Sequence, residues 1–224
     1  MEKLTDGLWR WTARHPEWHP GDFGAEVACF AAQAGDTTLL IDPLLPAEDG
    51  DARSVPDAID GALRDRLAIL ITIPYHVRSS EELWKRYRKR AETTIHGHPA
   101  CAKRLDDESA FRPIDTDEEL PGGVTAHPIG KPRRYETPLH LPSHSALVFG
   151  DAVAEWKGKL VVWAADKVDA RVERFYRERF NPTLEPLLGL GAENVLVTHG
   201  QPVMGGGTES LRKALKAKPW YHHG

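Results

Sequence analysis

The chain has 224 residues, of which 41% are hydrophobic and 28% are charged, with a formal net charge of −4. This balance is ordinary for a globular protein, and no basic patch is dense enough to predict a nucleic-acid partner. No stretch approaches the roughly 18 apolar residues of a membrane span, and two cysteines make no disulfide framework, so we expect a single cytoplasmic domain over residues 1–224.

Strands are expected first. Residues 8–18 alternate between apolar and polar side chains, which predicts a strand that runs into a proline-broken loop. Residues 27–32 and 37–41 flank the turn signal Gly35-Asp36 and predict an antiparallel hairpin. The second strand of this hairpin would deliver Asp42 to its C-terminal end.

The next segment alternates helices with strands. The continuous apolar run of residues 67–73 predicts a strand that is buried on both faces, and residues 74–78 a loop after it. Ser79 and Glu82 have the spacing of a capping box, which predicts a helix from there to about Arg90. Further helices are expected at 55–66 and 99–105, and a strand at 93–96.

The second half contains runs of strands, with helices between the later ones, and this order favours a mixed sheet sandwich flanked by helices. The predicted strands are 122–129, 137–141, 146–149, 160–163 and 195–198, and the predicted helices are 173–180, a stretch from there to 188, and 208–217.

Three segments in order carry a resemblance to a known family. They are Leu39-Leu40-Ile41-Asp42-Pro43, the segment 146–152 with its Gly-Asp-Ala end, and the segment 195–203 with its His-Gly-x-Pro end. Together they resemble the metallo-β-lactamase superfamily over roughly residues 20–210. The resemblance implies an α/β fold, an αββα four-layer sandwich of two mixed sheets flanked by helices. It also implies an active site at one edge, built from loops at strand ends.

Most of the family's metal ligands are missing. The family carries a His-x-His-x-Asp-His loop at the place of residues 72–78, and alignment puts Ile73, Tyr75, Val77 and Arg78 at the four ligand positions. A further family histidine should fall near Lys131-Pro132, where none stands. Hydrolytic zinc needs about three protein ligands and a water. No bound cofactor is therefore expected.

Asp151 and His199 are the two family ligands that remain. If zinc did bind, a mononuclear site would have to recruit His76, one place out of register. Other histidines would serve only if loops fold unusually, and we expect them to be polar residues at strand ends, an exposed turn or a solvated tail: His96, His98, His127, His140, His144, His222 and His223.

The loss of metal leaves Asp151 as a costly buried charge. We expect the guanidinium of Arg78 to take the vacated space and pair with Asp151, with Asp42 as a further partner. The alternative is that Arg78 points to solvent while Asp151 caps a loop.

Three functions stay open. In the first, the protein binds a small molecule in the old cleft, where Asp42, Tyr75 and Arg78 lie beside His76, Asp151 and His199. In the second, it is a hydrolase with a remodelled site, which uses one metal or a metal-free histidine base. In the third, tryptophans near the chain ends form an interaction surface, unless they only cover the core edge: Trp9, Trp11, Trp18 and Trp220.

Overall fold

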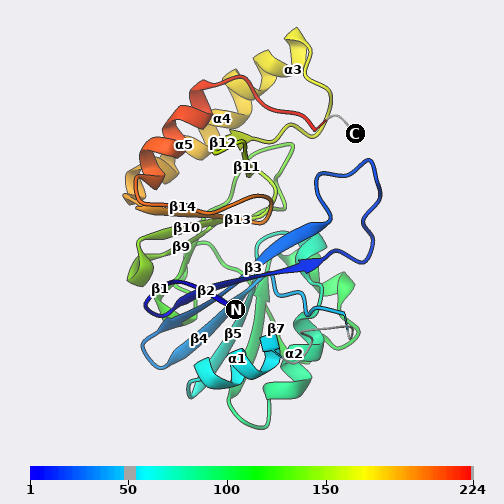
Figure 1. Cartoon of the computed structure of the whole chain (residues 1–224), viewed down its shortest axis with the longest axis vertical. Helices are drawn as coiled ribbons and strands as arrows, with labels where there is room; N and C mark the ends of the chain where they lie inside the picture. Colours follow the sequence, from blue (N-terminus) through cyan, green and yellow to red (C-terminus); the bar gives the residue numbers. More distant parts are fainter. Residues whose placement is uncertain (48–53, 223–224) are drawn as a thin grey trace.

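The computed structural model describes residues 1–47 and 54–222. Two large sheets pack face to face, with helices on the outer side of each (Figure 1). The first sheet has seven strands in chain order: β1 (Glu2–Thr5), β2 (Leu8–Arg14), β3 (Glu26–Ala34), β4 (Thr37–Ile41), β5 (Arg66–Ile71), β6 (Glu92–Gly97) and β7 (Phe111–Pro113).

Strands β1 to β4 of this sheet are antiparallel neighbours, whereas β4 to β7 run parallel. Helices α1 (Ser54–Ala62) and α2 (Ser80–Tyr87) cover its outer face. All of β4 is buried, as is all of β5 after its first residue, as expected for strands packed on both faces. Because β4 and β5 are parallel, Asp42 and the loop 72–78 emerge side by side at one edge.

The second sheet has the order β14–β13–β10–β9–β8. Its central strands β10 and β13 are parallel, so that Asp151 and His199 leave the sheet at the same edge. A separate hairpin joins β11 to β12. The strand bounds are β8 (Thr125–Ala126), β9 (Leu139–Leu141), β10 (Ala146–Phe149), β11 (Val153–Trp156), β12 (Lys159–Val162), β13 (Asn194–Val197) and β14 (Val203–Met204).

Helices of the C-terminal half lie outside the second sheet (Figure 1). They are α3 (Ala170–Phe175), which continues into a π-helical turn (Tyr176–Phe180), then α4 (Asn181–Leu184) and α5 (Gly207–Lys216). No helix in the described residues is both long and apolar enough to cross a membrane.

Three apolar clusters separate the four layers. One lies between the two sheets, around Phe30, Leu39 and Val148. A second lies beneath α1 and α2, and a third lies between the second sheet and the C-terminal helices. The expected αββα architecture is therefore confirmed.

Several local predictions were wrong. The strand expected at 122–129 is only Thr125–Ala126, because a turn at Pro121–Gly123 and a loop after His127 replace its ends. The capping box does not form: the Ser79 hydroxyl accepts a hydrogen bond from the Leu45 N–H instead of from its own helix. Strands β1, β7, β11 and β14 were not predicted, and all of them have four residues or fewer.

Candidate functional site

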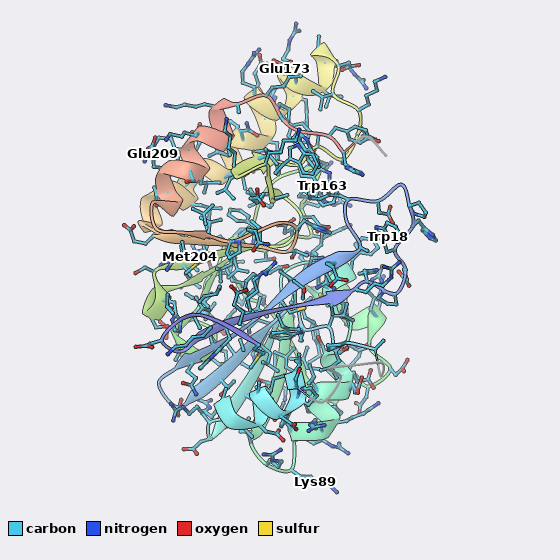
Figure 2. The ribbon with its side chains drawn as sticks, in the orientation of Figure 1. Trp18, Lys89, Trp163, Glu173, Met204 and Glu209 are labelled. Carbon is cyan, nitrogen blue, oxygen red and sulfur yellow. The ribbon has the colours of Figure 1, made fainter. Side chains whose placement is uncertain are left out.

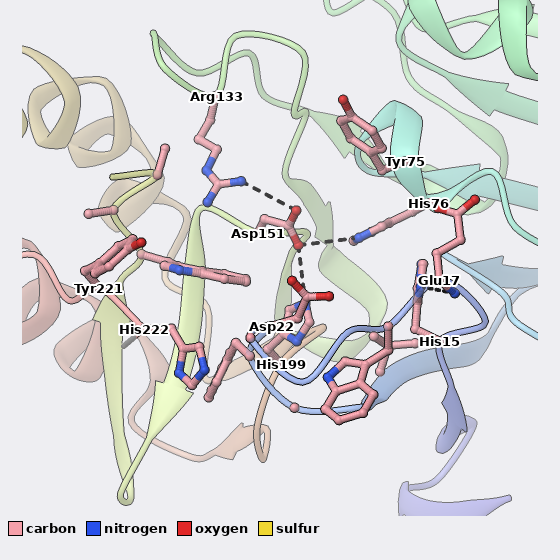
Figure 3. Close-up of a pocket in the computed structure, with 18 of the residues that line it drawn as sticks. His15, Glu17, Asp22, Tyr75, His76, Arg133, Asp151, His199, Tyr221 and His222 are labelled. Carbon is pink, nitrogen blue, oxygen red and sulfur yellow. Dashed lines mark hydrogen bonds and ion pairs between the residues drawn. The ribbon is translucent and has the colours of Figure 1, made fainter. Parts of the chain in front are cut away.

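A cavity of about 430 Å³ opens at the edge where the strand ends of both sheets meet (Figure 3). The loop between β2 and β3 closes one side of it, and the C-terminal segment closes the other. Its lining includes His15, Glu17, Trp18, Asp22, Phe23, Tyr75, His76, Arg78, Arg133, Asp151, Trp163, His199, Tyr221 and His222.

Asp42 lies behind this cavity as a buried anchor, with 1% of its surface exposed. One carboxylate oxygen accepts the Thr72 N–H at 2.8 Å, and the other accepts the Thr72 hydroxyl and contacts His76 Nδ1 at 2.9 Å. The backbone of Asp42 is left-handed, with φ 49°, and this turn directs its carboxylate back under the loop 72–76. Asp42 thus fixes His76 rather than lining the cavity itself.

His76 connects two carboxylates. Its ring is 3% exposed, with Nδ1 on Asp42 and Nε2 3.4 Å from Asp151 Oδ1. Burial lowers the pKa of His76 and the charge of Arg78 opposes protonation, but the two carboxylates outweigh both, so the pKa is raised. A raised pKa favours the imidazolium form, which supplies a positive charge between Asp42 and Asp151.

Asp151 is the meeting point of the site (Figure 3). Its Oδ1 lies 3.4 Å from His76 Nε2 and 3.6 Å from His199 Nε2, while Oδ2 lies 3.5 Å from an Arg133 nitrogen. Burial raises the pKa of Asp151, but the two histidines more than offset this, and the pKa falls well below its usual value. The three predicted catalytic residues, His76, Asp151 and His199, are therefore brought together around an ionised carboxylate.

The cation beside Asp151 is a different arginine from the expected one. Arg78 donates to the main-chain oxygen of Asp42 at 3.0 Å, so the predicted pairing of Arg78 with the Asp151 carboxylate is wrong. Arg78 has a left-handed backbone, with φ 42°, which turns its side chain toward the end of β4. Arg133 takes the predicted role. It directly follows Lys131-Pro132, where the resemblance placed a histidine ligand. That position in the sequence could have predicted that Arg133 lies in the site.

Glu136 is a second residue that sequence reasoning missed. Its side chain is completely buried, and its carboxylate accepts the N–H groups of Gly150, Asp151 and Ala152 at 3.0–3.1 Å. Burial raises the pKa of Glu136 to about 7, although Arg133 and these N–H donors limit the rise. Glu136 therefore holds the turn that presents Asp151.

Aromatic rings form the wall opposite the loop 72–78. The Phe23 ring lies at the centre of a cluster, 5.5 Å from Trp163 and 4.8 Å from Trp220 between ring centroids. His222 packs 5.4 Å from Phe23 and lines the cavity, so the expectation of a solvated tail is wrong for it; His223 lies outside the described residues. Figure 2 shows Trp18 on the β2–β3 loop and Trp163 near the C-terminal segment.

Tyr75 lies at the rim, 66% exposed, with its ring under the guanidinium of Arg104 at 4.3 Å. The other predicted histidines lie away from the cavity lining. His96 is buried beside the Thr94 hydroxyl, and His144 is held by the main-chain oxygen of Gln33. His15, which was not predicted, does line the cavity.

The residues present do not fit the two-metal site of the resembled family. Ile73 and Val77 offer no donor atoms, and Arg133 places a permanent cation on Asp151. In residues 1–47 and 54–222, no group of three or more His, Cys, Asp or Glu side chains is arranged to hold a metal ion. His76, Asp151 and His199 do converge, but the Asp151 oxygen itself lies between the two rings (Figure 3).

Comparison with known proteins identifies the fold of the chain through solved structures alone. No family model matches the chain, and no curated protein sequence does. Among solved structures, a metallo-β-lactamase family protein from Thermus thermophilus is 16% identical, with a TM-score of 0.61, over 96% of this chain and 78% of that one. A metallo-β-lactamase from Pontibacter korlensis is 13% identical, with a TM-score of 0.64, over 96% and 97% of the two chains.

A third similar structure is the chemotaxis sensor ODP, described as a peroxy diiron species. It is 15% identical, with a TM-score of 0.61, over 98% of this chain and 94% of that one. At such identities the likeness concerns the backbone, and it shows that the chain has the metallo-β-lactamase fold.

Proposed function

We propose that this chain, which has the metallo-β-lactamase fold, binds a small organic molecule in the cleft beside Asp151 without dinuclear zinc chemistry. The observation that carries the proposal is the charge balance at the cleft floor. Asp151 is contacted by His76, His199 and Arg133, so protein side chains supply the positive charge that metal ions supply in the resembled family. The same residues leave a cavity of about 430 Å³ above them.

The size and chemistry of this cavity support ligand binding. Sites for small organic molecules are typically clefts of about 300–1,000 Å³, walled by aromatic and apolar side chains with a few fixed polar groups. Here Trp18, Phe23 and Trp163 provide the apolar wall, and the Asp151 cluster provides the fixed polar groups.

An activity assay tests the proposal. The purified protein, either treated with chelator or supplied with zinc, is given a β-lactam, a thioester, a phosphodiester and a lactone. We expect no zinc-dependent turnover of any of the four. Zinc-dependent turnover that is lost in Asp151→Ala and kept in Asp6→Ala, an exposed position away from the cavity, would overturn the proposal.

A metal-free hydrolase is the second candidate, favoured by the contact between His199 and Asp151. A carboxylate that orients an imidazole toward a cavity is the arrangement of a general base. In this scheme Asp151 would hold the His199 ring, His199 would take a proton from water, and His76 would balance the charge of Asp151. Turnover in chelator that is lost in His199→Gln and kept in His140→Gln, which lies away from the cavity lining, would favour this candidate over pure binding.

A further inference from the structure

The cavity residues hold an excess of hydrogen-bond donors without partners. Among the described residues, eight buried side-chain nitrogen or oxygen atoms have no hydrogen-bond partner, and four of them belong to residues that line this cavity. Three of these four are donors, the Nε atoms of Arg78 and Arg133 and the indole Nε1 of Trp18. Such unpaired buried donors are costly, and an acceptor-rich ligand relieves the cost.

The two guanidinium groups are only partly used by the protein. Each has five N–H donors. Arg78 donates to the Asp42 main-chain oxygen and lies beside the Cys29 thiol, while Arg133 makes one long contact of 3.5 Å with Asp151. Arginine binds planar oxyanions in a two-pronged manner, so these side chains favour a carboxylate.

The aromatic wall favours a flat ring next to that carboxylate. Arg133 lies over the Trp163 ring at 5.4 Å, which places a cation directly beside an aromatic surface. Phe23 lies 5.5 Å from the same indole in an edge-to-face arrangement. The acidic groups of the β2–β3 loop, Glu17 and Asp22, are solvent-exposed and lie at the mouth of the cavity rather than at its floor.

We infer that the ligand of this cleft is an aromatic carboxylate, with its carboxylate on Arg78 and Arg133 and its ring against Trp163 and Phe23. This inference rests on the proposed function, because it requires that the cleft binds a small molecule at all.

Calorimetric titration with two matched probes tests the inference. The probes are 2-naphthoate and its uncharged analogue 2-naphthamide, which share a ring system and differ in charge. We expect naphthoate to bind in the millimolar range or tighter, and naphthamide to bind at least about tenfold more weakly, since a lost charge-assisted hydrogen bond has that effect. Arg133→Gln and Arg78→Gln should each weaken naphthoate binding by a similar factor, whereas the exposed Arg177→Gln should not.

The outcomes separate the two proposals. If naphthamide binds as well as naphthoate, or if neither arginine variant weakens naphthoate, the carboxylate inference fails while small-molecule binding stands. If neither probe binds wild-type protein, both proposals lose their support. Thermal unfolding of each variant identifies a loss of fold, and because Arg78 and Arg133 come from different loops, either variant alone is sufficient.

Discussion

Two turns meet at the cleft. In each, one or more backbone N–H groups donate to a buried carboxylate that lies outside the turn. The turn after β5 is held by Asp42, and the turn after β10 is held by Glu136. Glu136 accepts only backbone N–H groups, so any sequence with the same backbone would satisfy it. Asp42 also contacts the His76 ring, and through His76 it is connected to Asp151.

The two turns also differ in how closely their sequences resemble the metallo-β-lactamase family. The turn after β10 has the Gly-Asp-Ala sequence of the resembled family, and its Gly150 lies where a Cβ would clash with Thr72. The loop 72–78 lies at the end of β5, where the resemblance assigns the metal-ligand positions to Ile73, Tyr75, Val77 and Arg78. The turn after β10 is thus held by backbone contacts, whereas side chains from other loops, His76 and Arg133, contact the Asp151 carboxylate.

The largest predicted effect comes from removing the link between the turns. His76→Ala leaves Asp42 and Asp151 buried with one cation fewer, and breaking a buried ion pair costs about 3–5 kcal/mol. We expect a loss of that order in the free energy of unfolding, measured in urea. His15→Ala, at a partly exposed position of the same cavity, is the control and should change stability little. Equal losses in the two variants would contradict the account.

A second prediction concerns the contact between the turns. A Cβ at Gly150 would lie 2.7 Å from the Thr72 hydroxyl and 3.3 Å from Glu136. We therefore expect Gly150→Ala to destabilise the fold by about 1–3 kcal/mol, the usual cost of overpacking. At Gly189 a Cβ meets nothing within 4 Å, so Gly189→Ala in the same unfolding assay should be close to neutral. A neutral Gly150→Ala would mean that the two turns do not need this close approach.

A smaller effect is expected when an amide group replaces the buried carboxyl group of Glu136. In Glu136→Gln one acceptor oxygen becomes an amide donor, which leaves at least one of the three backbone N–H groups without a partner. The loss should be about 1 kcal/mol, the lower end of the range for an unsatisfied buried group. Urea unfolding at neutral pH measures it, with the exposed Glu178→Gln as control. A gain in stability would show that the turn does not depend on these acceptors.

A further effect is a change in the slope of stability with pH. The pKa of Glu136 is raised to about 7 from an ordinary value of 4.5, so the folded state binds this proton more tightly than the unfolded state does. Its contribution is therefore largest below pH 4.5 and declines as the pH rises toward 7. Between those limits the melting temperature of wild type should fall relative to that of Glu136→Gln. Parallel curves would contradict the raised pKa.

The sequence predicted the frame of the site better than its contacts. Strand ends can be predicted from the sequence, because the apolar run before Thr72 and the short strands before Gly150 and His199 have clear patterns. These patterns placed Asp151 and His199 at one edge. Contacts between loops cannot be predicted in this way. Arg133 and Glu136 lie in a segment without periodicity, and only the folded chain brings them to Asp151.

The aromatic wall shows the same limit. Phe23 contacts Trp163, Trp220 and His222, which follow it by more than a hundred residues, and no local pattern predicts such a contact. The expectation of a solvated tail was wrong for His222 for this reason, since a short segment at a chain end has no sequence pattern that predicts burial.

The most direct test of the central claim is the number of zinc ions that the folded protein holds, measured by native mass spectrometry after zinc loading and removal of excess metal. The account predicts well below one zinc per chain, because His76 and Arg133 already neutralise Asp151. It also predicts that Asp151→Asn gives the same spectrum. Two tightly held zinc ions in wild type, lost in Asp151→Asn, would contradict the account.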